Sequence, residues 1–215
     1  MYKLAVFDMD GTILDTLEDL KDSTNFALEK CGYPTRSYDE VRRFVGNGIR
    51  KLIERAVPEG LTVEQIDRVH EVFTEHYKVH CADTTKAYDG IKPLLEKLRA
   101  SGVKTAVVSN KADYGVQELC RDYFDGLFDY AVGEREGIRR KPAPDAVNEA
   151  LRALGIDKSE AVYIGDSDVD FETAKNAELP CISVLWGFRD EEFLREKGAT
   201  LFVRDPAEIY DIIMA

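Results

Sequence analysis

Closely spaced cysteines and long apolar runs are both missing from this 215-residue sequence. The four cysteines, Cys31, Cys81, Cys120 and Cys181, form no CxxC pair, which favours reduced thiols over a disulfide framework or a zinc site. No stretch approaches the apolar length of a membrane span, and the first ten residues lack the apolar segment of a signal peptide. These absences predict a soluble cytoplasmic protein.

Positive charge is also scarce. The sequence has 29 lysines and arginines against 41 aspartates and glutamates, which gives a net charge of −12. Proteins that bind nucleic acids carry basic patches, so the composition argues against nucleic acids and anionic membranes as partners. An acidic protein that handles a small anion needs a local reversal of charge, from a metal ion or from a few placed cations. Nothing in the pattern distinguishes a monomer from a homodimer.

Short apolar runs alternate with helical patterns over most of the chain. Each run is typical of a buried strand; they lie at residues 3–7, 104–110, 127–133, 161–167, 181–187 and 199–205. Apolar residues at helical spacing lie between them, as at 90–101 and 145–154. The alternation predicts an α/β fold, in which helices cover both faces of a Rossmann-like parallel sheet.

One segment departs from this alternation. Between residues 17 and 81 the sequence shows only helical spacing, in four successive stretches. An all-helical insert between the first strand and the rest predicts a second, smaller domain. We therefore expect a catalytic core formed by residues 1–15 and 83–215 and a helical cap domain formed by residues 16–82.

The stretch VFDMDGTILDT, residues 6–16, places Asp8, Asp10 and Asp15 within eight residues and contains no Lys, Arg or His. Neighbouring carboxylates repel one another, and burial raises the cost of each charge. Either a cation binds there or the cluster is a solvated turn.

Polar residues follow the other predicted strands as well. Ser109, Asn110 and Lys111 follow one strand, Asp166 follows another, and Lys141 lies in a connection before a proline. The carboxyl ends of parallel strands lie at one edge of a sheet, where ligands bind. We expect these side chains to meet the aspartates of the first strand there.

This set of side chains supports phosphoryl transfer. The carboxylate of Asp8 can attack phosphorus, and the oxygens of Asp8 and Asp166 suit Mg²⁺. Ser109 can hydrogen-bond the phosphoryl oxygens, while Lys141 supplies positive charge opposite Asp8. Asp10 can protonate the leaving oxygen and then deprotonate a water molecule.

Four motifs in this order, DMDGT, SN, KPAP and GDSDVD, resemble those of the haloacid dehalogenase superfamily. They span residues 8–170, and the chain is similar to the phosphoglycolate phosphatase-like branch, which has a helical cap. The resemblance implies that Asp8 is the nucleophile and Asp10 the general acid/base. It also implies Mg²⁺ as cofactor, with Asp166 and the Asp10 carbonyl as ligands and Asp170 in support of the metal shell.

The resemblance implies further binding residues in the core and in the cap. The phosphate-binding set is Gly11, Thr12, Ser109, Asn110 and Lys141. The cap sequence FVGNGIRKLIERA is similar to that of the same branch. It implies that Gly46, Asn47 and Gly48 form a loop facing the active site and that Arg50 meets a substrate anion. Lys111 is either a phosphate contact or a solvated side chain.

The sequence thus predicts Mg²⁺-dependent hydrolysis of a small phosphorylated metabolite through a phosphorylated Asp8. A phosphoglycolate-like substrate is favoured. Two alternatives stay open. A mutase similar to β-phosphoglucomutase would use the same phosphorylated aspartate to isomerise a phosphosugar. A non-catalytic regulator would keep the pocket only to bind Mg²⁺ or phosphate.

Overall fold

The computed structural model describes all 215 residues, which form two compact units. The core unit comprises Met1–Leu14 and Ala87–Ala215, and the cap unit is Asp15–Lys86. The first boundary lies within one residue of the expected position, whereas the second lies later in the chain than residue 82.

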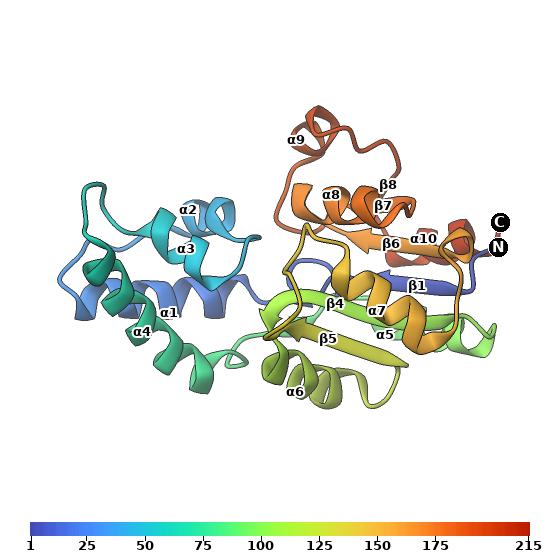
Figure 1. Cartoon of the computed structure of the whole chain (residues 1–215), viewed down its shortest axis with the longest axis horizontal. Helices are drawn as coiled ribbons and strands as arrows, with labels where there is room; N and C mark the ends of the chain where they lie inside the picture. Colours follow the sequence, from blue (N-terminus) through green and yellow to red (C-terminus); the bar gives the residue numbers. More distant parts are fainter. The chain divides into compact units, whose positions relative to one another are not determined.

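A six-stranded sheet forms the centre of the core unit, with every neighbouring pair of strands parallel. Its order is β5-β4-β1-β6-β7-β8 (Figure 1). The strands are β1 (Leu4–Phe7), β4 (Lys104–Ala112), β5 (Tyr130–Glu134), β6 (Ala161–Gly165), β7 (Cys181–Val184) and β8 (Phe202–Val203). The predicted α/β class is confirmed, since each apolar run of the sequence overlaps one of these strands.

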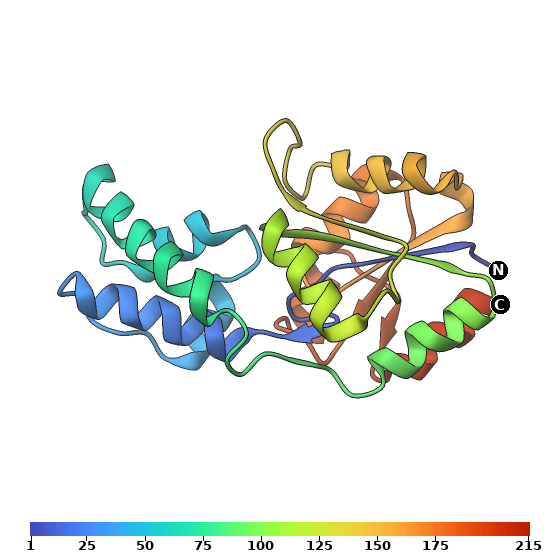
Figure 2. The same cartoon turned by 90° about the horizontal axis from the view of Figure 1, so that it is seen from below.

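Helices cover both faces of this sheet (Figures 1 and 2). Side chains alternate between the faces along a strand: Phe7 of β1 belongs to one buried apolar cluster and Val6 to the other. The cluster of Phe7 includes α5 (Ile91–Ala100), α6 (Asp113–Phe124) and α10 (Pro206–Met214). The cluster of Val6 includes α7 (Asp145–Leu154) and α8 (Asp168–Ala177). The connections contain η1 (Lys158–Glu160) and α9 (Glu191–Glu196).

The middle of the sheet contains a topological switch point. Strand β1 lies between β4 and β6, and Phe7 is in register with Val107 on one side and Ile164 on the other. After β1 the chain adds β4 and β5 on one side of β1, and it then adds β6, β7 and β8 on the other side. Ligands of open α/β sheets bind outside the carboxyl ends of the strands at such a point.

Four helices form the cap unit: α1 (Leu17–Lys30), α2 (Tyr38–Phe44), α3 (Ile49–Ala56) and α4 (Val63–His80). Helix α4 buries Val69, Phe73 and Tyr77 on one face, and this face packs on α1. Capping boxes start α2 at Ser37 and α4 at Thr62, because a side-chain oxygen there satisfies an unpaired backbone N–H.

Asp19 explains where the cap unit ends. Its buried carboxylate accepts hydrogen bonds from the backbone N–H and hydroxyl of Thr84, at 2.9 and 2.6 Å, and from those of Thr85, at 2.9 and 2.7 Å. Residues 84–85 are thereby held to α1. The two connections pair as short strands, β2 (Leu14–Asp15) and β3 (Lys86–Ala87), which are too short to leave a sequence pattern.

No helix of the protein combines the length and the apolar character needed to cross a membrane.

We predict that Asp19→Ala destabilises the cap unit by about 2–3 kcal/mol, because four donors lose a charged acceptor. Hydrogen exchange of the Thr84 and Thr85 amides should accelerate strongly. Asp22→Ala is the matched control, since Asp22 lies on the same helix with a 57% exposed side chain paired to Lys21. Unchanged exchange at Thr84 and Thr85 in Asp19→Ala would contradict the prediction.

Candidate active site

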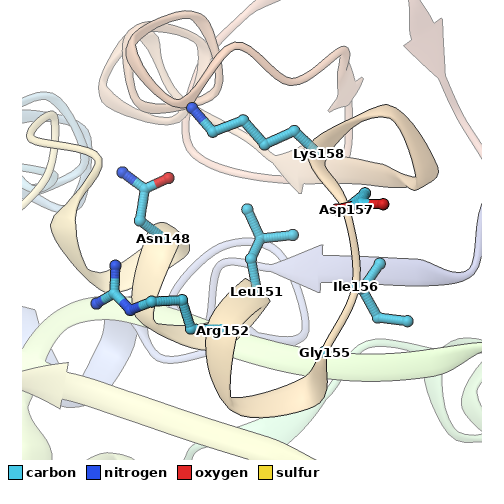
Figure 3. Close-up of a pocket in the computed structure, with 7 residues that line it drawn as sticks. All are labelled: Asn148, Leu151, Arg152, Gly155, Ile156, Asp157 and Lys158. Carbon is cyan, nitrogen blue, oxygen red and sulfur yellow. The ribbon is translucent and has the colours of Figure 1, made fainter.

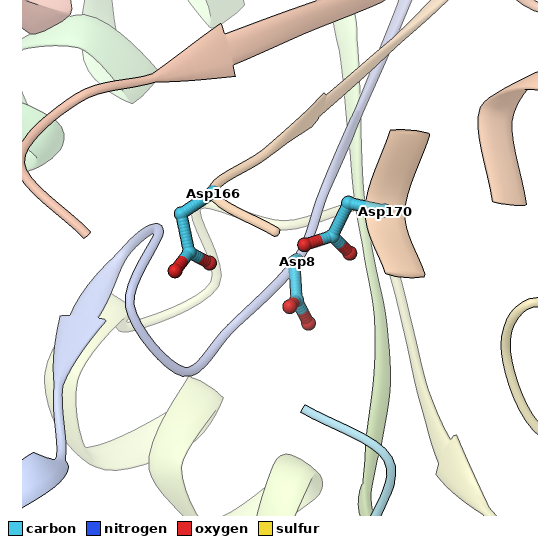
Figure 4. A group of neighbouring side chains, drawn as sticks. All are labelled: Asp8, Asp166 and Asp170. Carbon is cyan, nitrogen blue, oxygen red and sulfur yellow. The ribbon is translucent and has the colours of Figure 1, made fainter. Parts of the chain in front are cut away.

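Three aspartates converge at the carboxyl edge of the sheet, beside the switch point (Figure 4). Asp8 directly follows β1, Asp166 directly follows β6, and Asp170 lies in the first turn of α8. One carboxylate oxygen of each lies within 4.8 Å of the others, and all three residues are buried. Such crowding requires a compensating charge.

Lys141 supplies part of that charge. Its Nζ lies 2.8 Å from Asp8 Oδ1 and 2.7 Å from Asp170 Oδ1, and it donates to Tyr163 Oη at 3.1 Å. Three acceptors match the three protons of the ammonium group. The backbone of Lys141 is fixed as well, because Asn110 Oδ1 accepts from its N–H at 2.8 Å and Asn110 Nδ2 donates to its C=O at 3.1 Å.

The surrounding charges and burial shift the pKa values of these groups in different directions. Burial and the Asp170 carboxylate raise the pKa of Asp8 well above its ordinary value, although Lys141 acts in the opposite direction. Burial would also raise the pKa of Asp170, but the attraction and hydrogen bond of Lys141 outweigh it, and the pKa is lowered. Burial would lower the pKa of Lys141, but the two carboxylates raise it above its ordinary value. Lys141 and Asp170 therefore form the ionised pair of the site.

Asp170 has both oxygens engaged. Its Oδ1 binds Lys141 and accepts from Tyr163 Oη at 3.1 Å, and its Oδ2 accepts from the Ser167 hydroxyl at 2.5 Å and the Ser167 N–H at 3.1 Å. Asp170 is thus suited to hold Lys141 and the start of α8 rather than to contact a ligand directly.

Asp8 and Asp166 remain as the carboxylates that fit a cation. Burial, then the nearby Asp170, raises the pKa of Asp166 to about 7, while hydrogen bonds from Phe188 and Thr12 lower it. The charge of Arg189 also lowers this pKa but does not outweigh burial and Asp170, so a cation next to Asp166 would stabilise its ionised form. Hard oxygen donors at such a place suit Mg²⁺, so the residues present fit this ion.

The predicted phosphate-binding residues occupy different positions. Ser109 is buried at the end of β4, where its hydroxyl oxygen accepts from the Lys111 N–H at 3.2 Å, which leaves the hydroxyl proton for a ligand. Asn110 is committed to the backbone of Lys141. The hydroxyl of Thr12 donates to Asp166 at 3.0 Å, and Gly11 lies against the same carboxylate. A contact of these last three with phosphate stays a prediction.

Lys111 pairs with the second aspartate of the first motif. Its Nζ lies 3.3 Å from Asp10 Oδ1, and its side chain is only 6% exposed. A solvated Lys111 is therefore excluded. The ion pair places a cation next to the predicted general acid.

The predicted cap residues lie in the loop before α3 and in its first turn. Gly46, Asn47 and Gly48 form the loop, and Arg55 donates to Asn47 Oδ1 at 2.7 Å. Arg50 Nε lies 2.9 Å from Glu54 Oε1, and its guanidinium also pairs with Asp67. These ion pairs within the cap argue against Arg50 as a substrate contact. The approach of the loop to substrate stays a prediction.

Three residues that support the site were not predicted from the sequence. Tyr163 was visible only as one more residue of an apolar strand, although a buried tyrosine hydroxyl needs a partner. The backbone N–H of Phe188 donates to Asp166 Oδ2 at 2.7 Å, and Trp186 Nε1 donates to the Thr12 carbonyl at 3.0 Å. The donor of Phe188 is a backbone N–H, which leaves no signal in a sequence, whereas the donor of Trp186 is its indole side chain.

A surface groove of about 510 Å³ lies elsewhere on the core unit, at the end of α7 (Figure 3). Asn148, Arg152, Asp157 and Lys158 provide its polar side chains, and Lys158 Nζ pairs with Glu178 at 2.8 Å. None of the predicted site residues lines it.

Comparison with known proteins identifies a family and individual proteins to which this chain is similar. Residues 5–184 match the family model of haloacid dehalogenase-like hydrolases. The phosphoglycolate phosphatase of Aquifex aeolicus is 33% identical over 191 residues, covering 86% of each chain. That of Psychrobacter arcticus is 31% identical over 220 residues, covering 99% of this chain and 96% of its own. A crystal structure of a candidate phosphoglycolate phosphatase from Lactobacillus delbrueckii subsp. bulgaricus has a TM-score of 0.95 and 40% identity, covering 99% of this chain and 98% of the other.

We predict that Lys141→Met lowers stability by about 3–5 kcal/mol at pH 8 in EDTA, because buried carboxylates lose their counter-ion. Without Lys141 the folded-state pKa of Asp170 rises above that of the unfolded chain, and the already raised pKa of Asp8 rises further. The folded state then binds more protons, so the deficit shrinks as the pH falls from 8 towards 5.

Urea denaturation at both pH values measures this change. Lys158→Met is the control, since the exposed pair of Lys158 with Glu178 contributes little. A deficit in Lys141→Met that does not depend on pH would show that the repulsion among the carboxylates is not its cause.

Proposed function

The chain belongs to the haloacid dehalogenase-like hydrolases, in their phosphoglycolate phosphatase-like branch, and we propose that it is a Mg²⁺-dependent phosphatase of a small phosphomonoester. The observation that carries the proposal is the placement of Lys141 between Asp8 and Asp170, with Asp166 and Asp10 at the same sheet edge. A nucleophile, a cation-binding carboxylate and a proton donor are thereby available together.

In the first proposed step, a carboxylate oxygen of Asp8 attacks phosphorus. The new Asp8–phosphorus bond forms as the bond to the ester oxygen breaks, and Asp10 gives its proton to that leaving alcohol. Lys141 stabilises negative charge on the phosphoryl oxygens, while the hydroxyl of Ser109 donates a hydrogen bond to one of them. The hydrogen bond from the Met9 N–H to Asp8 Oδ1, at 2.7 Å, orients the nucleophile.

In the second step, a water molecule attacks the phosphorylated Asp8. Asp10, now ionised, takes a proton from the water as the bond between phosphorus and Asp8 breaks, and inorganic phosphate leaves. Asp8, Asp166 and the backbone carbonyl of Asp10 would hold Mg²⁺, which when bound neutralises charge on the transferring phosphoryl group.

We favour a phosphoglycolate-like substrate, because several relatives over most of the chain are named phosphoglycolate phosphatase. Lys111 supports this choice from the geometry. A buried ammonium group in the site, 3.3 Å from Asp10 Oδ1, is suited to bind a second anionic group on the substrate.

We predict that Asp8→Asn lowers phosphate release by about 10³-fold or more, because no other nucleophile replaces the carboxylate. The measurement is Mg²⁺-supplemented phosphate release over phosphoglycolate, sugar phosphates and nucleoside monophosphates, with EDTA as the metal-free arm. Acid quenching of wild type with labelled substrate should trap radioactivity on the protein, and Asp8→Asn should trap none.

The products distinguish the remaining alternatives. Free phosphate supports the phosphatase, an isomerised sugar phosphate would replace it by a mutase, and absence of turnover over the whole panel would indicate a non-catalytic binding protein. Normal turnover by Asp8→Asn would remove Asp8 as the nucleophile.

We predict that Lys111→Met raises KM for phosphoglycolate about 10-fold or more, as the loss of a charged hydrogen bond would. Ethyl phosphate, which has no second anion, should show no such rise. If Lys111 only orients Asp10, kcat falls equally for both substrates and KM stays constant.

A further inference from the structure

Asp166 lies in a slot bounded by two glycines from distant parts of the chain. A Cβ atom at Gly11 would lie 2.5 Å from Asp166 Oδ2, and one at Gly187 would lie 2.3 Å from Asp166 Cβ. Real Cβ atoms essentially never approach so closely. The turn after β1 and the turn after β7 therefore both come as near to Asp166 as backbone permits.

Each turn also donates one hydrogen bond to the carboxylate. The Thr12 hydroxyl donates to Oδ1 at 3.0 Å, and the Phe188 N–H donates to Oδ2 at 2.7 Å. Trp186 Nε1 joins the two turns through its 3.0 Å hydrogen bond to the Thr12 carbonyl. Two of these three hydrogen bonds join residues separated by more than 150 positions in the sequence.

We propose that the turn Trp186–Phe188 is a positioning element that orients Asp166 for binding a divalent cation. A carboxylate oxygen has two acceptor directions, and each oxygen of Asp166 uses one of them within the slot. An oxygen of Asp166 lies within 4.8 Å of a carboxylate oxygen of Asp8 (Figure 4), so fixing the Asp166 carboxylate would fix the remaining acceptor directions relative to that oxygen. Hydrogen bonds that fix a metal ligand in this way contribute substantially to affinity. The inference rests on the proposed function, in which Asp166 binds Mg²⁺.

A purely packing role predicts something different. If the two glycines serve only close packing, a methyl group at Gly187 lowers the stability of the protein but leaves the cation affinity of the folded molecules unchanged. If the slot orients Asp166, a methyl group at Gly187 displaces the carboxylate, and affinity falls in molecules that remain folded.

The test is the affinity of the metal-free protein for Mn²⁺, measured by electron paramagnetic resonance, and for Mg²⁺, followed by fluorescence. Trp186 is the single tryptophan of the chain and lies beside the site, so its emission reports on occupancy. We expect Gly187→Ala to weaken both ions by about 10-fold or more, the size found when supporting contacts of metal ligands are removed. Thr12→Val, which removes the other donor, should weaken them similarly.

Gly102→Ala is the matched control. Gly102 precedes β4, at the opposite end of the sheet, and has a φ of +77° with open space at its Cβ position. Alanine there strains the backbone and lowers stability, but it should leave both affinities at the wild-type value. The control separates a loss of folded protein from a loss of orientation.

Wild-type Mn²⁺ affinity in folded Gly187→Ala would overturn the inference. If that variant does not fold, Trp186→Phe replaces it: loss of one hydrogen bond should weaken Mn²⁺ about 3-fold, and unchanged affinity would overturn the inference. Failure of the proposed function looks different, because wild type and Asp166→Asn would then bind Mn²⁺ equally.

Discussion

Mutual repulsion among buried carboxylates is the constraint around which the core unit is organised. Asp8, Asp166 and Asp170 are buried and each places one carboxylate oxygen within 4.8 Å of those of the other two. In a low-dielectric environment, like charges at such distances are costly. The ammonium group of Lys141 offsets the repulsion for two of them, and the proposed Mg²⁺ would offset it for Asp166.

The fold holds Lys141 next to the carboxylates of Asp8 and Asp170. Lys141 belongs to none of the strands, so three neighbouring strands hold it: Asn110 of β4 fixes its backbone, Tyr163 of β6 accepts from its ammonium group, and Asp8 follows β1. These strands are adjacent in the order β4-β1-β6, on either side of the switch point of the sheet. Their adjacency brings together the groups that hold Lys141.

The sequence predicted the fold class because buried parallel strands are short apolar runs, and it predicted the charged members of the cluster because they follow those runs. The sequence did not predict the hydrogen-bond partners of the polar residues in the site. Thr12 and Asn110, expected to bind phosphate, donate to Asp166 and to the backbone of Lys141. Their hydroxyl and amide groups could serve either purpose, and only the three-dimensional distances decide. The role of Phe188 is carried by a backbone N–H, which every residue except proline possesses.

The charges at this edge also bear on the choice of substrate. The carboxylates of Asp8, Asp10, Asp166 and Asp170 exceed the ammonium groups of Lys111 and Lys141 by a formal charge of two. A divalent cation brings the edge close to neutrality, whereas a monovalent cation leaves it repelling any anion. A phosphomonoester bearing a carboxylate adds up to three negative charges, so it requires both the cation and the release of Lys111 from Asp10. In the proposed mechanism, a proton on Asp10 would have the same effect as that release, because a neutral Asp10 would no longer compete for the ammonium group. Proton donation by Asp10 and recognition of a second anion by Lys111 would then be coupled through one ion pair.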